Sequence, residues 1–510
     1  MNENTKNKKT QGRYFTDVEL DLYAQLKRFF ECYHGDRDYR KAIDTGVFTD
    51  AQIQRLRDTG VKFDLSEVEI LWKNKDEIGD CAEKTLNEES FTDEQQKLLD
   101  KYPLIKLWMK FNEFKRKRHI NNVTNPPNSP NPRYDAWRNR RILSGKSELG
   151  SYGHSIDYPA LAIEIAKGCS VGCYFCAFDA QKLETVFDYN DEHNRHEFRK
   201  VATAFNQHLG YTAGHALMYY STEPYDNPHY IDFLKEYEKI TGSFLCTATA
   251  ACTKDVWMKE LIAEYRKRGL HWPRLSVLSR GMLRKVHELY TAEELRDVAL
   301  LMQMSESERE KVEGGRIFKD NDSQRDDVEE NIPLLGEMVP QGSIACVAGF
   351  LVNMIDKTIK LVSPCFTTER WKYGYRIFDE RSFENADEFD AILTEMIEVN
   401  MPVSLYPEMP MRFRDDLKFK EEENGFSVYS PYYKHDFNSH SIHKKAGALI
   451  AQGAFNYDQV FNQLVDEYQF NPFQVMSFLK LLFDNGLLDE LHHRPENRQK
   501  ILIHDVAESI

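Results

Sequence analysis

Residues 167–178 read KGCSVGCYFCAF, and this stretch decides the expected fold and chemistry of the chain. Its cysteines, Cys169, Cys173 and Cys176, have the spacing C-x-x-x-C-x-x-C and follow an apolar run at residues 161–166 that predicts a buried strand. Thiolates are soft ligands that suit iron–sulfur clusters and zinc. Three thiolates on one short loop can bind three irons of a cubane, which leaves the fourth iron for a small chelating molecule.

A structural zinc site, or three buried thiols, is the alternative interpretation of this loop. Structural zinc takes four ligands, usually from paired C-x-x-C units. The sequence has no second pair, and no histidine lies between Gly168 and Glu192. The spacing therefore favours an iron–sulfur cluster.

Outward from the loop, short apolar runs alternate with helical patterns. The runs lie at residues 161–166, 216–221, 244–250, 274–279, 343–351 and 358–362. Helix-like segments near 195–208, 228–240 and 253–268 separate the first four runs. Repeated strand–helix units predict a parallel sheet or barrel with right-handed crossovers. The expected fold class is therefore α/β, with either a parallel sheet or a barrel.

Composition changes along the chain predict three regions. Residues 1–133 form a helical N-terminal region, in which Thr16, Thr49 and Thr92 each give a helix-start signal. Residues 134–405 form the strand–helix region, and residues 304–331 are a charged, exposed insertion within it. Residues 406–510 form a small winged-helix-like α+β domain: a hairpin turns near residues 423–425, and helices follow near 445–452, 457–468 and 472–485.

Composition also excludes some functions. The 510 residues include 67 Lys and Arg against 82 Asp and Glu, a net charge of −15, which disfavours binding to a nucleic-acid backbone. No run of residues is long and apolar enough for a membrane span, and the first ten residues lack the apolar segment of a signal peptide. We expect a cytoplasmic protein with neither nucleic acid nor membrane as a partner.

The cysteine loop resembles that of the radical S-adenosylmethionine (SAM) superfamily, which implies that the strand–helix region folds as the partial (β/α)6 barrel of that superfamily. The resemblance implies that Cys169, Cys173 and Cys176 bind a [4Fe-4S] cluster, that SAM chelates the open iron, and that Phe175 packs against the adenine.

Two further segments resemble SAM-binding segments of this superfamily. Tyr220-Ser-Thr-Glu-Pro is similar to the Gly-Gly-Glu-Pro segment that holds the amino group of SAM, which implies that role for Thr222 and Glu223. Ser221 and Thr222 replace the two glycines. Ser276 and Ser279, on the predicted fourth strand, stand where the superfamily contacts the ribose and carboxylate of SAM.

A narrower resemblance is to the PoyD-type proteusin epimerases, which convert L-residues of a ribosomally made precursor peptide to D-residues. It covers about residues 15–400 and depends on short pieces, among them Asp226-Asn-Pro and Ser363-Pro-Cys. The resemblance implies that Cys365 returns the hydrogen atom to Cα. Cys365 also follows the predicted sixth strand, at the end where barrel active sites gather. Cys346, in the middle of the predicted fifth strand, is the reserve donor.

Residues 410–490 resemble a PqqD-type domain, which binds the leader of a precursor peptide as an added strand. The resemblances therefore imply two partners: a leader-bearing precursor peptide, and an external electron donor of the flavodoxin or ferredoxin type.

Two other functions remain open. One is another radical SAM peptide maturase, for methylation or crosslinking; no cysteine follows Cys365, which disfavours the auxiliary cluster of crosslinking enzymes. The other is a noncatalytic peptide adaptor that binds zinc.

Overall fold

The computed structural model describes residues 14–87, 89–119, 129–269, 273–304, 307, 315–316 and 345–491. The chain divides into two compact units. Unit 1 comprises Met1–Pro126, Glu223–Tyr225 and Cys246–Lys311, and unit 2 comprises Pro127–Thr222, Asp226–Leu245 and Val312–Ile510. Most of the predicted insertion at 304–331 lies outside the described residues.

Unit 1 begins with helices, as predicted. They are α2 (Asp17–Gly35), α3 (Arg37–Thr45), α4 (Asp50–Asp58), α5 (Ile70–Lys73), α6 (Lys75–Asn87), α7 (Asp93–Lys101) and α8 (Pro103–His119). Thr16, Thr49 and Thr92 each form a capping box at the start of a helix, which confirms the three start signals.

Unit 1 also contains a small parallel sheet. Its strands are β5 (Ala248–Thr249), β6 (Arg274–Val277) and β7 (Ala299–Met302), in that order. Helix α12 (Asp255–Lys267) connects β5 to β6, and α13 (Arg280–Leu289) and α14 (Ala292–Leu295) connect β6 to β7. The strand–helix units predicted for this part of the chain are therefore present.

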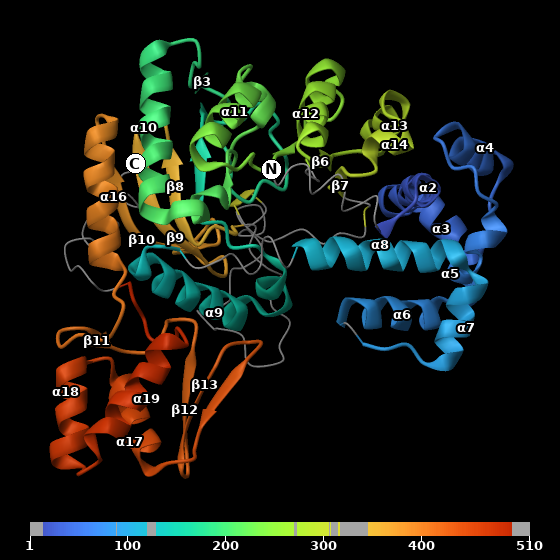
Figure 1. Cartoon of the computed structure of the whole chain (residues 1–510). Helices are drawn as coiled ribbons and strands as arrows, with labels where there is room; N and C mark the ends of the chain where they lie inside the picture. The colour runs from blue at the N-terminus through green and yellow to red at the C-terminus, as the bar shows by residue number, and fades with distance from the viewer. Residues whose placement is uncertain are drawn as a thin grey trace. The chain divides into compact units, whose positions relative to one another are not determined.

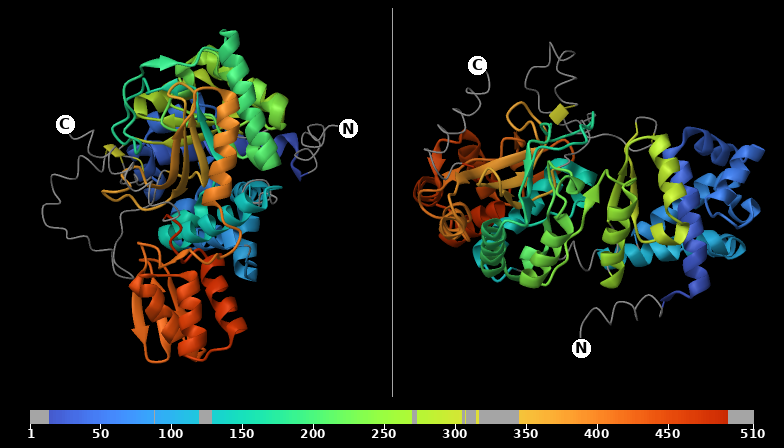
Figure 2. Two further views of the ribbon diagram at one scale, coloured as in Figure 1. Left: turned by 90° about the vertical axis from the view of Figure 1, so that its left-hand side faces the viewer. Right: turned by 90° about the horizontal axis from the view of Figure 1, so that it is seen from above.

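Unit 2 contains a five-stranded sheet in the order β10-β9-β8-β1-β4. Strands β4 (Ala216–Leu217) and β8 (Gly349–Asn353) run parallel to β1 (Leu161–Glu164), whereas β9 (Thr358–Pro364) and β10 (Tyr375–Ser382) extend the sheet antiparallel. Helices α10 (Glu192–Leu209) and α16 (Ala386–Asn400) lie side by side along this sheet (Figure 1, Figure 2). Phe205 of α10 packs against Phe350 of β8 and Phe389 of α16, so the two helices cover one sheet face.

The opposite face of this sheet is also apolar. Ala162, Leu217 and Val362 belong to one buried cluster, together with Tyr375. Because neighbouring residues of a strand point to opposite faces, this face is distinct from the one beneath α10 and α16.

The fold is thus mixed α/β, and its described strands form several small sheets, none of which closes into a barrel. The structure does not confirm the predicted barrel. It also corrects the direction of the sixth run, because β9 is antiparallel to β8. An apolar run predicts a buried strand but carries no information on strand direction.

The last described part of unit 2, residues 406–491, is called the C-terminal region. Strands β12 (Lys418–Glu422), β13 (Gly425–Tyr429) and β14 (Lys434–Phe437) form an antiparallel sheet, and β11 (Pro410–Met411) pairs with β15 (Phe455–Asn456). Helices α17 (Ser441–Gln452), α18 (Tyr457–Asn462) and α19 (Pro472–Asp484) follow the sheet. The predicted hairpin and three helices are confirmed.

Candidate functional site

The cysteine loop in unit 2 is closed by a short ladder. Strands β2 (Ala166–Lys167) and β3 (Thr185–Val186) pair antiparallel. The backbone N–H of Cys169 donates to Gln181 O at 2.9 Å, and that of Leu183 donates to Cys169 O at 3.2 Å. Gly168 has φ +82°, and a Cβ there would lie 2.4 Å from Lys182 O. The glycine before the first cysteine is therefore required by the close approach of the two sides of the loop.

The three loop cysteines are each partly exposed. The sulfur of Cys176 accepts a hydrogen bond from Ala180 N at 3.4 Å, a contact of the kind that tunes cluster thiolates. Within the described residues, no three His, Cys, Asp or Glu side chains are close enough to hold a metal ion, so these sulfurs do not converge. The three cysteines are nevertheless suitable ligands for an iron–sulfur cluster, because they are accessible thiols on one closed loop.

Asp226 and Asn227 anchor this loop from the next part of unit 2. The carboxylate of Asp226 accepts hydrogen bonds from the backbone N–H of Ser170 at 2.9 Å and from its hydroxyl at 2.5 Å. The buried side-chain amide of Asn227 donates to Ile165 O at 3.0 Å and to Phe187 O at 2.9 Å. Asp226 and Asn227 thus hold both the loop and the chain on either side of it.

Arg316 holds the other side of the loop. Its guanidinium donates to Cys173 O at 2.5 Å, to Ala180 O at 2.8 Å and to the Asp179 carboxylate at 3.1 Å, and its backbone N–H donates to Cys176 O at 2.9 Å. Arg316 was not predicted to support the loop, because it lies within the predicted exposed insertion. The signal that could have found it is the glycine pair at 314–315, which precedes it.

The residues predicted to contact SAM lie in different units. Phe175 is partly buried in the cysteine loop, and its ring meets that of Tyr174 edge-on at 5.0 Å. Thr222 belongs to unit 2, whereas Glu223 belongs to unit 1. The buried carboxylate of Glu223 accepts hydrogen bonds from Ala250 N at 2.8 Å, from Tyr225 N at 3.1 Å and from the Thr249 hydroxyl.

The two predicted serines lie in unit 1. Ser276 is on β6, as expected. Ser279 lies beyond the end of β6, which corrects its predicted place on the strand. Its hydroxyl accepts the N–H of Met282 at 3.1 Å and caps α13. This capping contact gives Ser279 a structural role in the helix.

Cys365 follows β9 directly, and its side chain is completely buried. Its thiol donates to Phe366 O at 3.1 Å, and burial raises its pKa far above the usual range, so it stays protonated. Because β9 runs antiparallel to β8, Cys365 lies at the sheet edge where β8 and β1 begin. The cysteine loop follows the other end of β1, which corrects the expectation that Cys365 lies at the carboxyl ends of the parallel strands.

Cys346 precedes β8, which corrects its predicted place in the middle of a strand. It is partly exposed and packs against the buried cluster of Ala162, Leu217 and Val362. It also packs, together with Phe366, against a second cluster. Cys346 and Phe366, the residue after Cys365, therefore border one apolar region of unit 2.

A row of aromatic rings crosses the same sheet face. Phe178, two residues after Cys176, lies 4.3 Å from Tyr220 between ring centroids, and Tyr220 lies 6.3 Å from Tyr375. Tyr375 pairs with Pro364, the residue before Cys365. The buried Tyr220 hydroxyl has no hydrogen-bond partner among the described residues. The row connects the end of the cysteine loop with the Cys365 segment.

Comparisons with known proteins give one relative and no activity. The chain is 31% identical over 485 residues to the uncharacterized protein y4wI of Sinorhizobium fredii (strain NBRC 101917 / NGR234), covering 93% of this chain and 89% of the relative. No protein-family profile matches the chain, and no solved structure is similar to it. Among the described residues, no helix has the length and apolar character of a membrane span.

Proposed function

The chain belongs to the family of the uncharacterized protein y4wI of Sinorhizobium fredii, and we propose that it is a radical SAM epimerase of ribosomally made peptides. The observation that carries this proposal is the closed loop of Cys169, Cys173 and Cys176, held by Asp226 on one side and by Arg316 on the other. A loop with three accessible thiols suits a cluster that keeps one iron open.

In this proposal the three cysteines hold a [4Fe-4S] cluster. When bound, the cluster and SAM supply a carbon radical that removes the Cα hydrogen of a peptide residue. The residues of the chain bind and orient the groups around this step. Phe175, within the loop, is the proposed adenine contact, and Thr222, Glu223 and Ser276 are the other proposed SAM contacts. Ser279 is the weakest of these, because its hydroxyl already caps α13.

The finer architecture that we propose is the partial (β/α)6 barrel of this superfamily. Six strands in parallel pairings support it, in chain order β1, β4, β5, β6, β7 and β8. Helices α10, α11 (Tyr230–Thr241), α12 and α13 alternate with the first five of them. The pairing of β4 with β5 that such a barrel requires does not occur among the described residues.

A thiol is the proposed hydrogen donor. The Cα radical takes a hydrogen atom from the S–H bond on the opposite face, which inverts the residue and leaves a sulfur radical. One electron and one proton, supplied through a flavodoxin- or ferredoxin-type reductant, then restore the thiol. The resemblance favours Cys365, which lies at the strand ends away from the cysteine loop, so the proposal requires the peptide to reach both. The partial exposure of Cys346 and its contact with the sheet face support the reserve donor.

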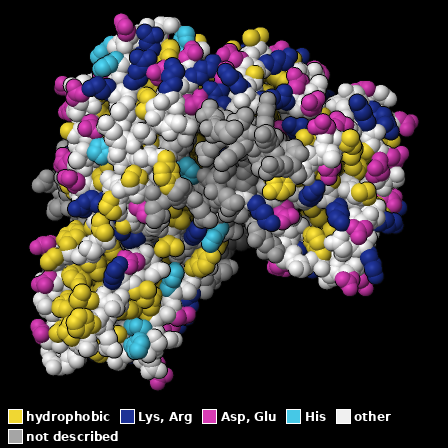
Figure 3. Space-filling model, viewed as in Figure 1, with side chains coloured by type: hydrophobic (Ala, Val, Ile, Leu, Met, Phe, Trp, Pro, Cys, Tyr) yellow, Lys and Arg dark blue, Asp and Glu magenta, His cyan; other side chains and the backbone are white. Residues whose placement is uncertain are grey.

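The C-terminal region is the proposed site for the leader of the precursor. Strand β14 is an edge strand, and its Phe437 packs against Phe478 of α19 at 5.6 Å. Phe473 and Met476 of α19 are 78% and 48% exposed, and hydrophobic side chains gather over α18 and α19 in Figure 3. An added strand along β14 with apolar side chains toward α19 is therefore the proposed binding mode.

The test is incubation of anaerobic enzyme, SAM, reductant and precursor peptide in D2O. Epimerisation adds one deuterium at Cα of each converted residue and gives D-amino acids on hydrolysis. A gain of a methyl group supports methylation instead, and a loss of two hydrogens supports crosslinking. A protein that binds zinc and leaves the peptide unchanged supports the adaptor.

A further inference from the structure

The segment that carries Cys365 is tied to a buried ion pair. The carboxylate of Glu148, on α9 (Pro132–Ser155), accepts the backbone N–H of Phe366 at 3.0 Å. The same carboxylate pairs at two points with the guanidinium of Arg376 on β10. Glu148 and Arg376 are 1% and 6% exposed. Removal of Arg376 leaves the buried Glu148 carboxylate without its ion-pair partner, and removal of Glu148 takes away the acceptor of the Phe366 N–H. The main chain beside the thiol therefore depends on both residues.

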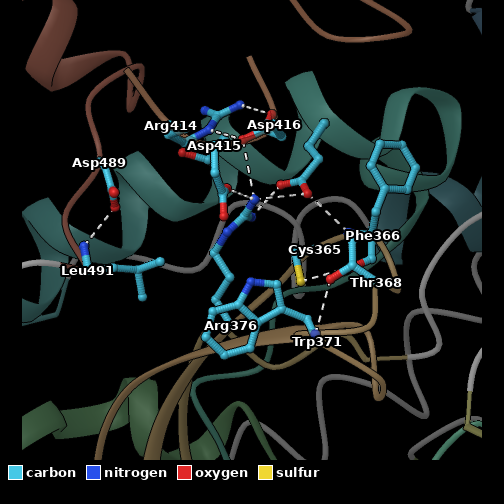
Figure 4. A network of polar contacts seen from close by, with 12 residues as sticks. Cys365, Phe366, Thr368, Trp371, Arg376, Arg414, Asp415, Asp416, Asp489 and Leu491 are labelled. Carbon is cyan, nitrogen blue, oxygen red and sulfur yellow. Dashed lines mark hydrogen bonds and ion pairs between the residues drawn. The ribbon is translucent and has the colours of Figure 1, made fainter. Parts of the chain in front are cut away.

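Two aspartates of the C-terminal region also bind the guanidinium of Arg376. Its guanidinium donates to Asp415 at 2.8 Å and to Asp416 at 3.3 Å. Asp416 is held in turn by two hydrogen bonds of 2.8 Å from Arg414. Figure 4 shows Arg376 between Cys365 on one side and Asp415 and Asp416 on the other. The ion pair beside the thiol therefore continues into the C-terminal region.

A second contact covers the same segment. The ring of Phe366 stacks on that of Tyr432 at 6.0 Å, and Tyr432 lies in the turn between β13 and β14. Gly150, where α9 is kinked with φ +55°, allows this approach, because a Cβ there would lie 2.6 Å from the Tyr432 ring. The pairing of Tyr429 with Lys434 closes this turn, so a peptide strand added to β14 contacts the hairpin that covers Phe366.

We propose that Glu148 and Arg376 are positioning residues that keep the Cys365 thiol covered. Asp415 and Tyr432 stabilise the same covered arrangement from the C-terminal region. A peptide that binds the C-terminal region breaks these contacts and exposes the thiol. The inference rests on the proposed function, because only a hydrogen donor needs this thiol to meet a peptide. A completely buried thiol cannot reach Cα, whereas a covered thiol is protected from oxidation until the substrate is bound.

The test measures how fast Cys365 of the full chain is alkylated by iodoacetamide, read by peptide mass mapping. We expect slow alkylation in the unaltered protein and an increase of about tenfold in Asp415→Asn and in Tyr432→Ala, because local opening limits access to a buried thiol. Arg376→Lys keeps the positive charge but loses the bidentate pairing with Glu148, and it is expected to show the same increase in Cys365 alkylation. Alkylation of the partly exposed Cys346 in the same digest is the internal reference.

Arg381→Lys is the matched control, because Arg381 also forms a two-point pair on β10, with Asp379, outside this network. If Arg376→Lys does not fold, Asp415→Asn and Tyr432→Ala decide, since these side chains are only half-buried. Unchanged Cys365 alkylation in both folded variants overturns the inference. The alkylation assay needs no turnover. A negative result therefore contradicts the inference about the covered thiol, whereas absence of D-residues from the unaltered enzyme contradicts the proposed function.

Discussion

Arg316 donates a hydrogen bond of 2.5 Å to the carbonyl oxygen of Cys173, which lies 143 positions earlier in the chain. The same guanidinium bonds Ala180 O and Asp179, so one side chain spans the second half of the cysteine loop. A loop whose backbone is already fixed loses less conformational entropy when it binds a cluster. A positive charge beside the loop also stabilises thiolates.

Replacement of Arg316 by Gln is therefore expected to weaken cluster retention. After anaerobic reconstitution, iron loss to a chelator should be ~10-fold faster in the variant than in the unaltered protein, as for other residues that orient metal ligands. Arg381→Gln is the control, because Arg381 contacts Asp379 and not the loop. Equal iron loss in all three proteins contradicts the role of Arg316.

The proposed hydrogen donor predicts a specific uncoupling. Cys365→Ala should still form 5′-deoxyadenosine, because Cα hydrogen removal does not use the thiol, but should form D-residues at least ~100-fold more slowly. Cys346→Ala is the matched variant, since Cys346 and Phe366, the residue after Cys365, border the same apolar cluster. The ratio of 5′-deoxyadenosine to D-residues, measured by mass spectrometry, identifies the donor. Uncoupling in Cys346→Ala alone assigns the role to Cys346.

The sequence predicted the elements of this fold better than their arrangement. Capping at Thr16, Thr49 and Thr92 was predictable because it depends on residues three positions apart. The antiparallel direction of β9 was not, because strand pairing depends on distant partners. The position of Cys365 was therefore predicted at the wrong sheet edge.

The site was predictable to a similar extent. The three cysteines stand out by their spacing alone. Their supports do not, because Asp226 and Arg316 are ordinary charged residues until folding brings them to Ser170 and Cys173. Likewise, Ser279 was interpreted as a ligand contact, although its hydroxyl is three residues from the N–H that it caps.

Unit 1 is expected to lose stability in mild acid. His287 of α13 lies 3.0 Å from Glu31 of α2, and burial lowers its pKa from 6.5 to about 4. Between these values the unfolded chain binds a proton that the folded chain does not, so stability falls as pH falls from 6.5 toward 4. From pH 7 to pH 5 the expected loss is about 2 kcal/mol.

His287→Gln keeps an N–H for Glu31 but cannot titrate, so the variant should lack this loss. Hydrogen–deuterium exchange of the α2 and α13 peptides at both pH values, corrected for intrinsic exchange rates, measures it. The same pH dependence in the variant and the unaltered protein contradicts the assignment to His287.

Leader binding predicts an effect of the exposed face of α19. Phe473 is 78% exposed, so Phe473→Ser should leave folding unchanged but weaken precursor binding by ~10-fold, the usual effect of removing an apolar anchor. Val256→Ser, at a residue that is 84% exposed on α12, is the control for surface polarity alone. Equal precursor affinity of the two variants and the unaltered protein, by fluorescence anisotropy, contradicts the proposed binding face.

Metal analysis of protein purified without oxygen shows directly whether the cysteine loop holds an iron–sulfur cluster. We expect about four irons and four sulfides per chain, with absorbance near 400 nm that is lost when Cys169, Cys173 and Cys176 are replaced by Ala. Addition of SAM to the reduced protein should change its electron paramagnetic resonance spectrum, because SAM binds the open iron. Zinc in place of iron, bound by the same three cysteines, would contradict the account.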